Sequence, residues 1–273
     1  MLIKRSLVAA ILIPSALLAV LIGGLPFTIF VTIFLAAATL EYIRLVEKCG
    51  FEPGLIFTLL SVIVLAGTRF VFDLDHMGTV LSAVILSSSF YHLVKFEQNP
   101  GINPGNWGSS LSIILYIGWL GSYILSLRSL ESGMWWLLLI FPVVWIADTA
   151  AYLIGSWLGT HSLSPNTSPN KTWEGYLASV LSGTLSGGGL ALLYSHFTIQ
   201  TLPYQLFEGL LIGFVISITI PVGDLVESMI KRQAQTKDSG KIFPGHGGVF
   251  DRLDSLFWAA PISYYLIYYL LLP

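Results

Sequence analysis

The sequence predicts an all-α protein, a polytopic integral membrane bundle of about nine transmembrane helices. Of its 273 residues, 55% are hydrophobic and only 10% are charged, whereas a soluble domain of average composition has about 25% charged residues. The mean hydropathy is +0.78. The chain carries too little charge to solvate a globular surface, so most of it is expected to lie in a bilayer.

Nine apolar runs are each long enough to cross a bilayer as a helix, which takes about 18 residues or more. Strands of a membrane β-barrel would alternate in polarity over about ten residues, and these runs are continuous. Prolines inside several of them are tolerated because neighbouring membrane helices satisfy the freed backbone groups. The runs cover roughly residues 6–24, 25–43, 55–72, 77–94, 109–127, 134–157, 173–196, 206–226 and 255–272.

The first run follows Lys4 and Arg5, as the apolar core of a secretory signal peptide would. No small-x-small cleavage site is evident near residues 22–26, and a second long apolar run follows at once. We therefore expect the first run to be a transmembrane span.

The basic residues predict the orientation, because Lys and Arg concentrate on the cytoplasmic side of membrane proteins. With nine spans and a cytoplasmic N-terminus, only Arg69 and Arg128 of the 13 basic residues fall outside. The other 11 fall inside: Lys4, Arg5, Arg44, Lys48, Lys95, Lys171, Lys231, Arg232, Lys237, Lys241 and Arg252. The N-terminus is therefore predicted to be cytoplasmic.

The chain divides into an N-terminal region, residues 1–133 with about five spans, and a C-terminal region, residues 134–273. The second region contains two polar cytoplasmic loops, 159–172 and 227–254, and is predicted to be catalytic. A net charge of −2 gives no basic field that would attract nucleic acid. Cys49 is the single cysteine, which excludes an internal disulfide and a cysteine-rich zinc site.

Two carboxylates lie in or at the end of apolar runs, where ionised groups are costly and usually face a cavity, a metal or a partner. Asp148 lies in the run 134–157, and helix packing is the alternative explanation for it. Asp224 lies near the end of the run 206–226. Glu227, Ser228 and Lys231 follow it at spacings that place them along one helical face.

The loop 227–254 combines glycines with many charges. Glycines around His246 allow the backbone to approach a ligand closely and to direct N–H groups at an anion. The basic residues are Lys231, Arg232, Lys237, Lys241 and Arg252, and the acidic ones are Asp238, Asp251 and Asp254, with Asp224 just before them. Bases together with acids at a membrane surface suggest a metal-bridged polyphosphate, in which carboxylates hold Mg²⁺ and Lys and Arg bind phosphate oxygens.

Other kinds of site fit this loop poorly. The chain has no G-x-x-x-x-G-K-[ST] phosphate loop and no G-x-S-x-G hydrolase motif. His246 has no cysteine or second histidine nearby with which to bind zinc.

The loop 159–172 supplies Ser168, Asn170 and the cation Lys171. Glu174 stands at the start of the following helix, where the helix dipole favours a carboxylate. Helix capping and substrate binding are both open for Glu174.

Three motifs resemble those of phosphatidate cytidylyltransferases, also called CDP-diacylglycerol synthases. The longest runs from Ser228 to Asp254 and reads Ser-x-Ile-Lys-Arg-x4-Lys-Asp-x-Gly-x2-Phe-Pro-x-His-Gly-Gly-Val-x-Asp-Arg-Leu-Asp. Ser168–Gly175 resembles a second family motif and Asp148–Tyr152 a third. The resemblance covers about residues 142–261, and the N-terminal half matches only as a hydrophobic pattern.

The resemblance implies transfer of CMP from CTP to phosphatidic acid, giving CDP-diacylglycerol and pyrophosphate for phospholipid biosynthesis. It implies a Mg²⁺ requirement, and it allows a monovalent cation such as K⁺ beside the Mg²⁺. It also implies a homodimer in the bacterial inner membrane, with a site that opens to the cytoplasm and the bilayer.

The resemblance assigns Asp224 and Asp251 as the metal-binding pair. We expect Lys171, Lys231 and Arg232, which would bind phosphates, to be the other catalytic residues. The expected substrate-binding residues are Ser168, Asn170, Ser228, Lys237, Asp238, Lys241, His246, Gly247, Gly248, Arg252, Asp254, Asp148 and Glu174. The chain departs from the family at Asn166, where many relatives have a basic residue. Either Lys171 carries more of the phosphate charge here, or this loop binds phosphate more weakly.

Three alternatives stand beside this function. A CTP-dependent transferase acting on another lipid phosphate, such as an ether lipid, would keep the same motif. A secondary transporter would also place carboxylates in the membrane, but it predicts an internal hydropathy repeat, which the sequence lacks. A structural membrane protein would leave the charged, glycine-rich loop without a purpose.

Overall fold

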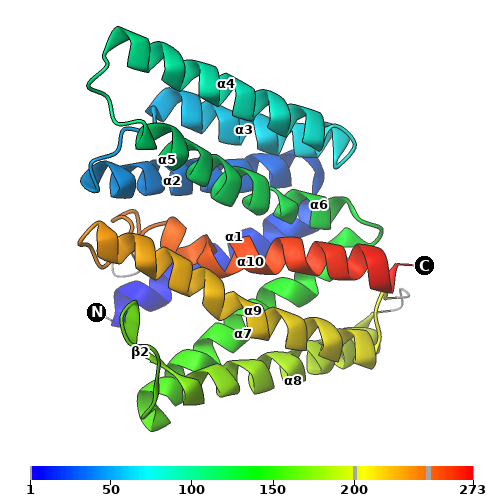
Figure 1. The fold of residues 1–273 in the computed structure, drawn as a ribbon. Coiled ribbons are helices and arrows are strands. Elements are labelled where there is room, and N and C mark those ends of the chain that lie inside the picture. The colour runs from blue at the N-terminus through cyan, green and yellow to red at the C-terminus, as the bar shows by residue number, and fades with distance from the viewer. Residues whose placement is uncertain (1, 199–201, 244–246, 273) are drawn as a thin grey trace. The chain divides into compact units, whose positions relative to one another are not determined.

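The computed structural model describes residues 2–198, 202–243 and 247–272, with side chains from Ala10 onward, and this part of the chain is almost entirely helical (Figure 1). The all-α prediction is therefore confirmed. The helices of the N-terminal part are α1 Leu2–Ile22, α2 Gly24–Lys48, α3 Leu55–Phe72, α4 Met77–Gln98, α5 Gly105–Ile113, the π-helical η1 Ile114–Leu120 and α6 Tyr123–Ser129. The remaining elements are α7 Gly133–Leu158, β1 Ser162–Ser164, β2 Ser168–Thr172, α8 Trp173–Phe197, α9 Leu206–Gln233, α10 Phe250–Leu266 and the π-helical η2 Ile267–Leu271.

Each of the nine expected spans coincides with a helical segment, of which the fifth combines α5, η1 and α6. By length and composition, seven of the helices in the described ranges are apolar enough to cross a membrane. The first and last segments fall short of that standard. In the first, the apolar stretch with described side chains is Ala10–Ile22, and in the last, α10 has only 17 residues before it passes into η2.

The two polar loops are more ordered than the sequence suggests. Because α9 continues to Gln233 and α10 begins at Phe250, both ends of the loop expected at 227–254 are helical. Within 159–172, β1 and β2 form a small antiparallel hairpin in which Ser162 pairs with Thr172 and Ser164 with Ser168. This hairpin is the only sheet among the described residues.

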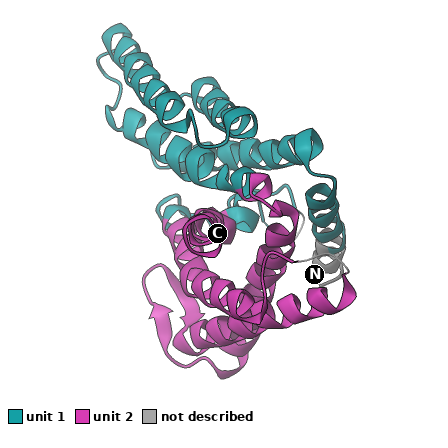
Figure 2. Ribbon diagram, turned by 90° about the vertical axis from the view of Figure 1, so that its right-hand side faces the viewer, with its two compact units in different colours: residues 1–126, 230–253 teal, residues 127–229, 254–273 magenta. Residues whose placement is uncertain are grey.

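The chain forms two compact units, shown in separate colours in Figure 2. Unit 1 comprises residues 1–126 and 230–253, and unit 2 comprises residues 127–229 and 254–273. This differs from the division at residue 133, which assigned the whole charged loop to the C-terminal region. The loop belongs to unit 1 because residues of α2 bind it: Glu41 accepts hydrogen bonds from Ser239 and Phe250, and the Tyr42 ring stacks on Phe250 at 5.1 Å.

In unit 2, glycines allow α8 and α9 to lie side by side (Figure 1). A Cβ at Gly187 would collide with the backbone of Gly209, and a Cβ at Gly213 would collide with that of Gly183. Small residues permit such close backbone contact between membrane helices. The two helices run antiparallel, so this register places the residues just before α8 beside the stretch of α9 near residue 224.

Unit 1 buries a cation that the sequence placed on the outer side. Arg69 of α3 is fully buried, with its guanidinium 4.1 Å from the centre of the Tyr123 ring and 5.1 Å from that of Trp119. Its Nε also donates to Ser122 Oγ at 3.2 Å. Cation–π contacts of this kind stabilise a desolvated cation by about 2 kcal/mol, which offsets part of the cost of burying Arg69 in an apolar unit.

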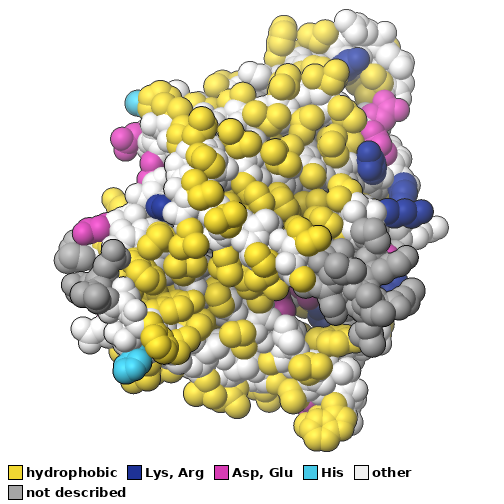
Figure 3. Space-filling model, turned by 180° about the vertical axis from the view of Figure 1, so that it is seen from behind, with side chains coloured by type: hydrophobic (Ala, Val, Ile, Leu, Met, Phe, Trp, Pro, Cys, Tyr) yellow, Lys and Arg dark blue, Asp and Glu magenta, His cyan; other side chains and the backbone are white. Residues whose placement is uncertain are grey.

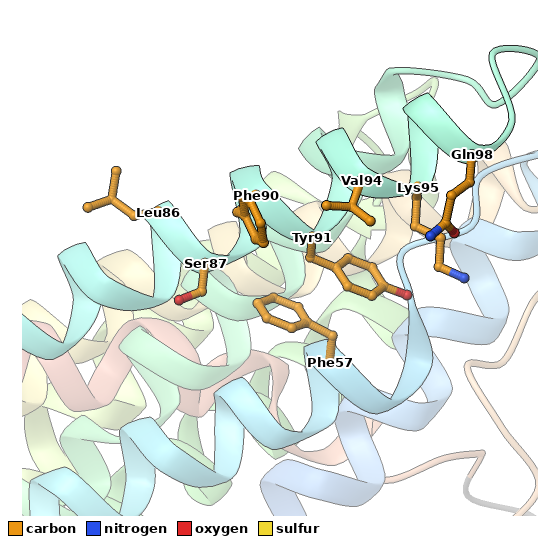
Figure 4. Close-up of a pocket in the computed structure, with 8 residues that line it drawn as sticks. All are labelled: Phe57, Leu86, Ser87, Phe90, Tyr91, Val94, Lys95 and Gln98. Atoms are coloured by element: carbon orange, nitrogen blue, oxygen red, sulfur yellow. The ribbon is translucent and has the colours of Figure 1, made fainter.

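Large hydrophobic side chains cover much of the face shown in Figure 3, while charged ones form small groups near its edges. An open groove of about 630 Å³ lies between α3 and α4 (Figure 4). Its lining residues are Phe57, Leu86, Ser87, Phe90, Tyr91, Val94, Lys95 and Gln98. The lining is mostly apolar and contains no carboxylate, so the groove is not part of the polar site.

Candidate active site

Three carboxylates gather in unit 2. Asp224 and Glu227 lie one turn apart on α9, Asp254 comes from α10, and one oxygen of each lies within 4.8 Å of the others. Glu227 is fully buried and Asp254 is 8% exposed, whereas Asp224 is half-buried. We call these three residues the carboxylate cluster. Negative charges this close repel one another unless a cation or a proton is shared, and carboxylate oxygens are the ligands that Mg²⁺ prefers.

Lys171 extends from β2 to this cluster. Its Nζ lies 2.6 Å from Asp224 Oδ2, and both side chains are partly exposed, at 23% and 38%. The residues around it differ in exposure: Ser168 is half-buried and Asn170 is exposed on the same strand. Of the loop residues expected at the site, Lys171 is therefore the one that contacts a carboxylate of the cluster.

Glu174 fastens the hairpin to α8. Its carboxylate accepts hydrogen bonds from Thr160 Oγ1 at 2.8 Å and from the His161 backbone N–H at 3.3 Å, and it lies 2.7 Å from His161 Nδ1. The N-cap position of α8 is filled by Thr172, whose hydroxyl accepts from the Gly175 N–H at 3.2 Å. These contacts hold the strand that carries Lys171, which favours a structural role for Glu174.

Asp148 connects two helices of unit 2. Its Oδ2 accepts a hydrogen bond from Ser255 Oγ at 3.0 Å, which joins α7 to α10. Ser255 follows directly after Asp254, and Asp148 adds negative charge near that carboxylate. Both explanations of Asp148, helix packing and participation in the site, remain consistent with this position.

The charged loop forms a second polar centre, in unit 1, around Asp251. Asp251 Oδ1 lies 2.6 Å from Lys231 Nζ. Oδ2 accepts hydrogen bonds from the backbone N–H groups of Ser239 and Gly248, at 2.9 and 2.8 Å, and lies 2.8 Å from Ser239 Oγ. Asp251 is 9% exposed, so these donors compensate for most of its lost hydration.

Glu41 completes this centre, and the sequence analysis missed it. It lies on α2, is fully buried, and its Oε2 accepts hydrogen bonds from Ser239 Oγ and the Phe250 N–H, both at 2.9 Å. The available signal was the position of Glu41 inside the apolar run 25–43, which is the same signal that singled out Asp148. We call Glu41, Lys231, Ser239 and Asp251 the loop cluster.

The other residues expected at the site differ in their surroundings. Arg232, Lys237, Asp238, Lys241 and Arg252 are exposed, and Ser228 is half-buried on α9. Gly247 has φ +83°, a left-handed conformation that favours glycine. The Gly248 amide, one of those expected to face phosphate or ribose, donates to Asp251 Oδ2 at 2.8 Å. His246 lies outside the described residues.

Comparison with known proteins gives a consistent result. The model of the cytidylyltransferase family matches residues 3–270. The chain belongs to this family. It is 33% identical to the phosphatidate cytidylyltransferase of Bacillus subtilis over 91% of each chain, and 32% identical to that of Synechocystis over 98% of this chain and 97% of the relative. The phosphatidate cytidylyltransferase of Haemophilus influenzae is 42% identical over 51% of this chain and 48% of its own.

The family match extends through the N-terminal half, where the sequence alone offered only a hydrophobic pattern. That half contains Glu41, so the loop cluster lies within the matched region. The resemblance drawn from the three C-terminal motifs is confirmed and extends over nearly the whole chain.

Replacing Glu174 with alanine tests the attachment of the hairpin. Glu174→Ala removes the acceptor that holds Thr160 and His161, so limited trypsin digestion in detergent should cleave after Lys171 several times faster. Glu208→Ala is the matched control, because Glu208 Oε2 accepts from the Gln205 N–H at 2.8 Å at the start of α9. Equal cleavage rates in the two variants would contradict this role.

Proposed function

We propose that this chain transfers CMP from CTP to phosphatidic acid, producing CDP-diacylglycerol and pyrophosphate for phospholipid biosynthesis. The observation that carries the proposal is the likeness, over nearly the whole chain, to relatives named phosphatidate cytidylyltransferase. The polar residues support it, because the chain brings carboxylates and lysines together in two places. We place the reaction at the cytoplasmic side of the bacterial inner membrane, as the distribution of basic residues predicts.

The main obstacle to this reaction is repulsion between two anionic substrates, not proton transfer. The phosphate of phosphatidic acid is already an anion at neutral pH, so it can attack the α-phosphate of CTP without a strong general base. Two anions must approach each other, and each pair of unit charges 4 Å apart costs about 4 kcal/mol at an effective dielectric constant of 20. Cationic side chains and a metal ion offset that cost.

We infer that Lys171 and Lys231 bind phosphate oxygens of the substrates. Lys171 lies beside Asp224 and Lys231 beside Asp251, each at 2.6 Å. Each lysine can exchange its carboxylate for phosphate oxygens when a nucleotide carrying its own counter-ion enters. The exposed bases Arg232, Lys237, Lys241 and Arg252 supply further positive charge on the loop.

A divalent cation fits the carboxylate cluster. Asp224, Glu227 and Asp254 present three oxygens within 4.8 Å of one another, on the rigid helices α9 and α10. Mg²⁺ bound there would neutralise triphosphate charge and stabilise the departing pyrophosphate. We assign Asp224 to this metal, and we keep Asp251 as the second expected ligand. Binding a metal at Asp251 Oδ1 requires the Lys231 ammonium to leave that oxygen. We make no assignment for a monovalent ion such as K⁺.

The assembly is inferred from the family resemblance alone. We propose that two copies associate in the membrane as a homodimer. Chemical cross-linking in native membranes should give a band at twice the monomer mass, and a monomer band alone would contradict the proposal.

Incorporation of labelled CTP into lipid tests the reaction directly. Detergent-purified protein with phosphatidic acid should move the label into the organic phase and release pyrophosphate, and it should do so only with Mg²⁺ present. Incorporation into an ether-lipid phosphate but not into phosphatidic acid would favour the alternative substrate. If no lipid phosphate is labelled by the folded protein, the proposed activity is wrong.

Removing the charge of either metal-site aspartate should nearly abolish turnover. We expect Asp224→Asn and Asp251→Asn to lose more than about 99% of the incorporation rate, since each change weakens metal binding and so removes transition-state stabilisation. Asp224→Asn should keep a near-normal melting temperature, because the Asp224 side chain is partly exposed. Asp251→Asn places an amide beside the buried Lys231 ammonium and should lower the melting temperature, so each variant is assayed well below its own melting temperature. Near-normal Mg²⁺-dependent activity in either variant would exclude its metal role.

The variant Asp148→Asn distinguishes helix packing from participation in the site as the role of Asp148. If the side chain only joins α7 to α10, Asp148→Asn still accepts the Ser255 hydrogen bond and turnover should stay within about twofold. If its charge takes part in the site, turnover should fall at least about tenfold with unchanged melting temperature. We expect the second outcome, because Asp148 is hydrogen-bonded to Ser255, the residue next to Asp254 of the carboxylate cluster.

A further inference from the structure

Glu41 is a buried carboxylate that none of the family motifs in this sequence includes. It is fully buried on α2, nearly 200 positions before the residues that it contacts. A buried carboxylate is costly unless its hydrogen bonds are satisfied. The contacts of Glu41 therefore indicate what its burial stabilises.

The hydrogen bonds of Glu41 Oε2 connect it to the segment that carries Asp251. Oε2 accepts from the Phe250 N–H, in the first turn of α10, and lies 2.9 Å from Ser239 Oγ. Ser239 in turn contacts Asp251 Oδ2 through both its N–H, at 2.9 Å, and its hydroxyl, at 2.8 Å. Glu41 thus binds one residue adjacent to Asp251 and one residue that binds Asp251.

The packing around Glu41 leaves its carboxylate little freedom. A Cβ at Gly240 would collide with Oε1, and a Cβ at Gly248 would collide with Oε2. Both glycines flank the segment between Ser239 and Asp251. Because Gly240 and Gly248 have no side chains, the Glu41 carboxylate fits between α2 and the charged loop. A larger residue at either position would collide with it.

The geometry points to Glu41 as a positioning residue for Asp251: it holds Ser239 and the start of α10, and so sets the orientation of the Asp251 carboxylate. This inference rests on the proposed function for its kinetic consequence, though the structural link stands without it. Both hydrogen bonds of Glu41 are to Oε2, so a glutamine that presents its amide oxygen at that place can still accept from the Ser239 hydroxyl and the Phe250 N–H. The position of the side chain, rather than its charge, is what the link requires.

A set of substitutions at position 41 separates position from charge. Glu41→Gln keeps the length and can accept from the Phe250 N–H, so we expect its kcat/KM for CTP to stay within about threefold of that of the unaltered protein. Glu41→Asp keeps the charge but is one methylene shorter, and Glu41→Ala removes the carboxyl group. We expect both to lose roughly 10- to 100-fold in kcat/KM, as losses of residues that orient a ligand do.

Thr39→Val is the matched control. Thr39 is also fully buried on α2, and its hydroxyl donates only within its own helix, to the Leu35 carbonyl at 2.8 Å. This variant should lower stability without changing kcat/KM or the exchange rates described next. Loss of activity in Thr39→Val equal to that in Glu41→Ala would mean that any buried polar change in α2 has this effect, and it would overturn the inference.

Hydrogen exchange supplies a readout that does not depend on activity. In Glu41→Ala and Glu41→Asp, the backbone amides of Ser239 and Phe250 should exchange at least about tenfold faster, while Glu41→Gln and Thr39→Val keep their protection. If the unaltered protein incorporates no CTP, the proposed function fails, and these exchange rates still decide whether Glu41 holds the loop. Unchanged exchange in Glu41→Ala would overturn the inference whatever the activity.

Gly240 provides a second test, and its single variant serves even if Glu41→Ala does not fold. Gly240→Ala places a methyl group against Glu41 and should reproduce the kinetic loss and the faster exchange. In a Glu41→Ala background the methyl group has space, so Gly240→Ala should add less than about twofold there. Full additivity of the two changes, or a Gly240→Ala variant like the unaltered protein, would contradict the contact on which the inference rests.

Discussion

The scarcity of charge in this chain makes every buried carboxylate a constraint on the fold. An ionised group removed from water must be paired or hydrogen-bonded. In unit 2, Asp224, Glu227 and Asp254 meet where α9 and α10 lie together, and their mutual repulsion requires a shared cation or proton. In unit 1 the arrangement depends on Asp251, whose two oxygens collect donors from α9 and the charged loop. The packing of helices and loops near both places must satisfy these groups.

In each unit a lysine lies beside one of these carboxylates. Lys171 neutralises Asp224 and Lys231 neutralises Asp251, each at 2.6 Å. In the proposed reaction, each lysine leaves its carboxylate for phosphate oxygens when a polyanion arrives with its own counter-ion. An enzyme that joins two phosphates benefits from this, because the same lysine stabilises the resting site and then attracts the substrate. The rigid supports, two helices and a hairpin held by Glu174, keep these groups in place.

Most of the fold could be predicted because its signals are local. The nine apolar runs needed only the length of a bilayer and the hydropathy of each stretch, and each coincides with a helical segment. The helical spacing of Asp224, Glu227 and Lys231 indicated that α9 continues past its apolar run. Hydropathy did not give its end at Gln233, because hydropathy ends where charges begin while helical hydrogen bonding does not. The β1–β2 hairpin escaped for a similar reason, since short polar strands lack the alternation that identifies a strand.

The sequence by itself determined the family, the membrane-embedded helical class and the set of charged residues, because motif spacing and hydropathy are properties of the chain. Only the tertiary structure decided which charges meet. It joined Lys171 to Asp224 across two helices that approach through their glycines, and it brought Glu41 to Ser239 over a separation of 198 residues. Contacts of that range depend on how helices pack, and helix packing depends on the shape of whole surfaces rather than on any local pattern.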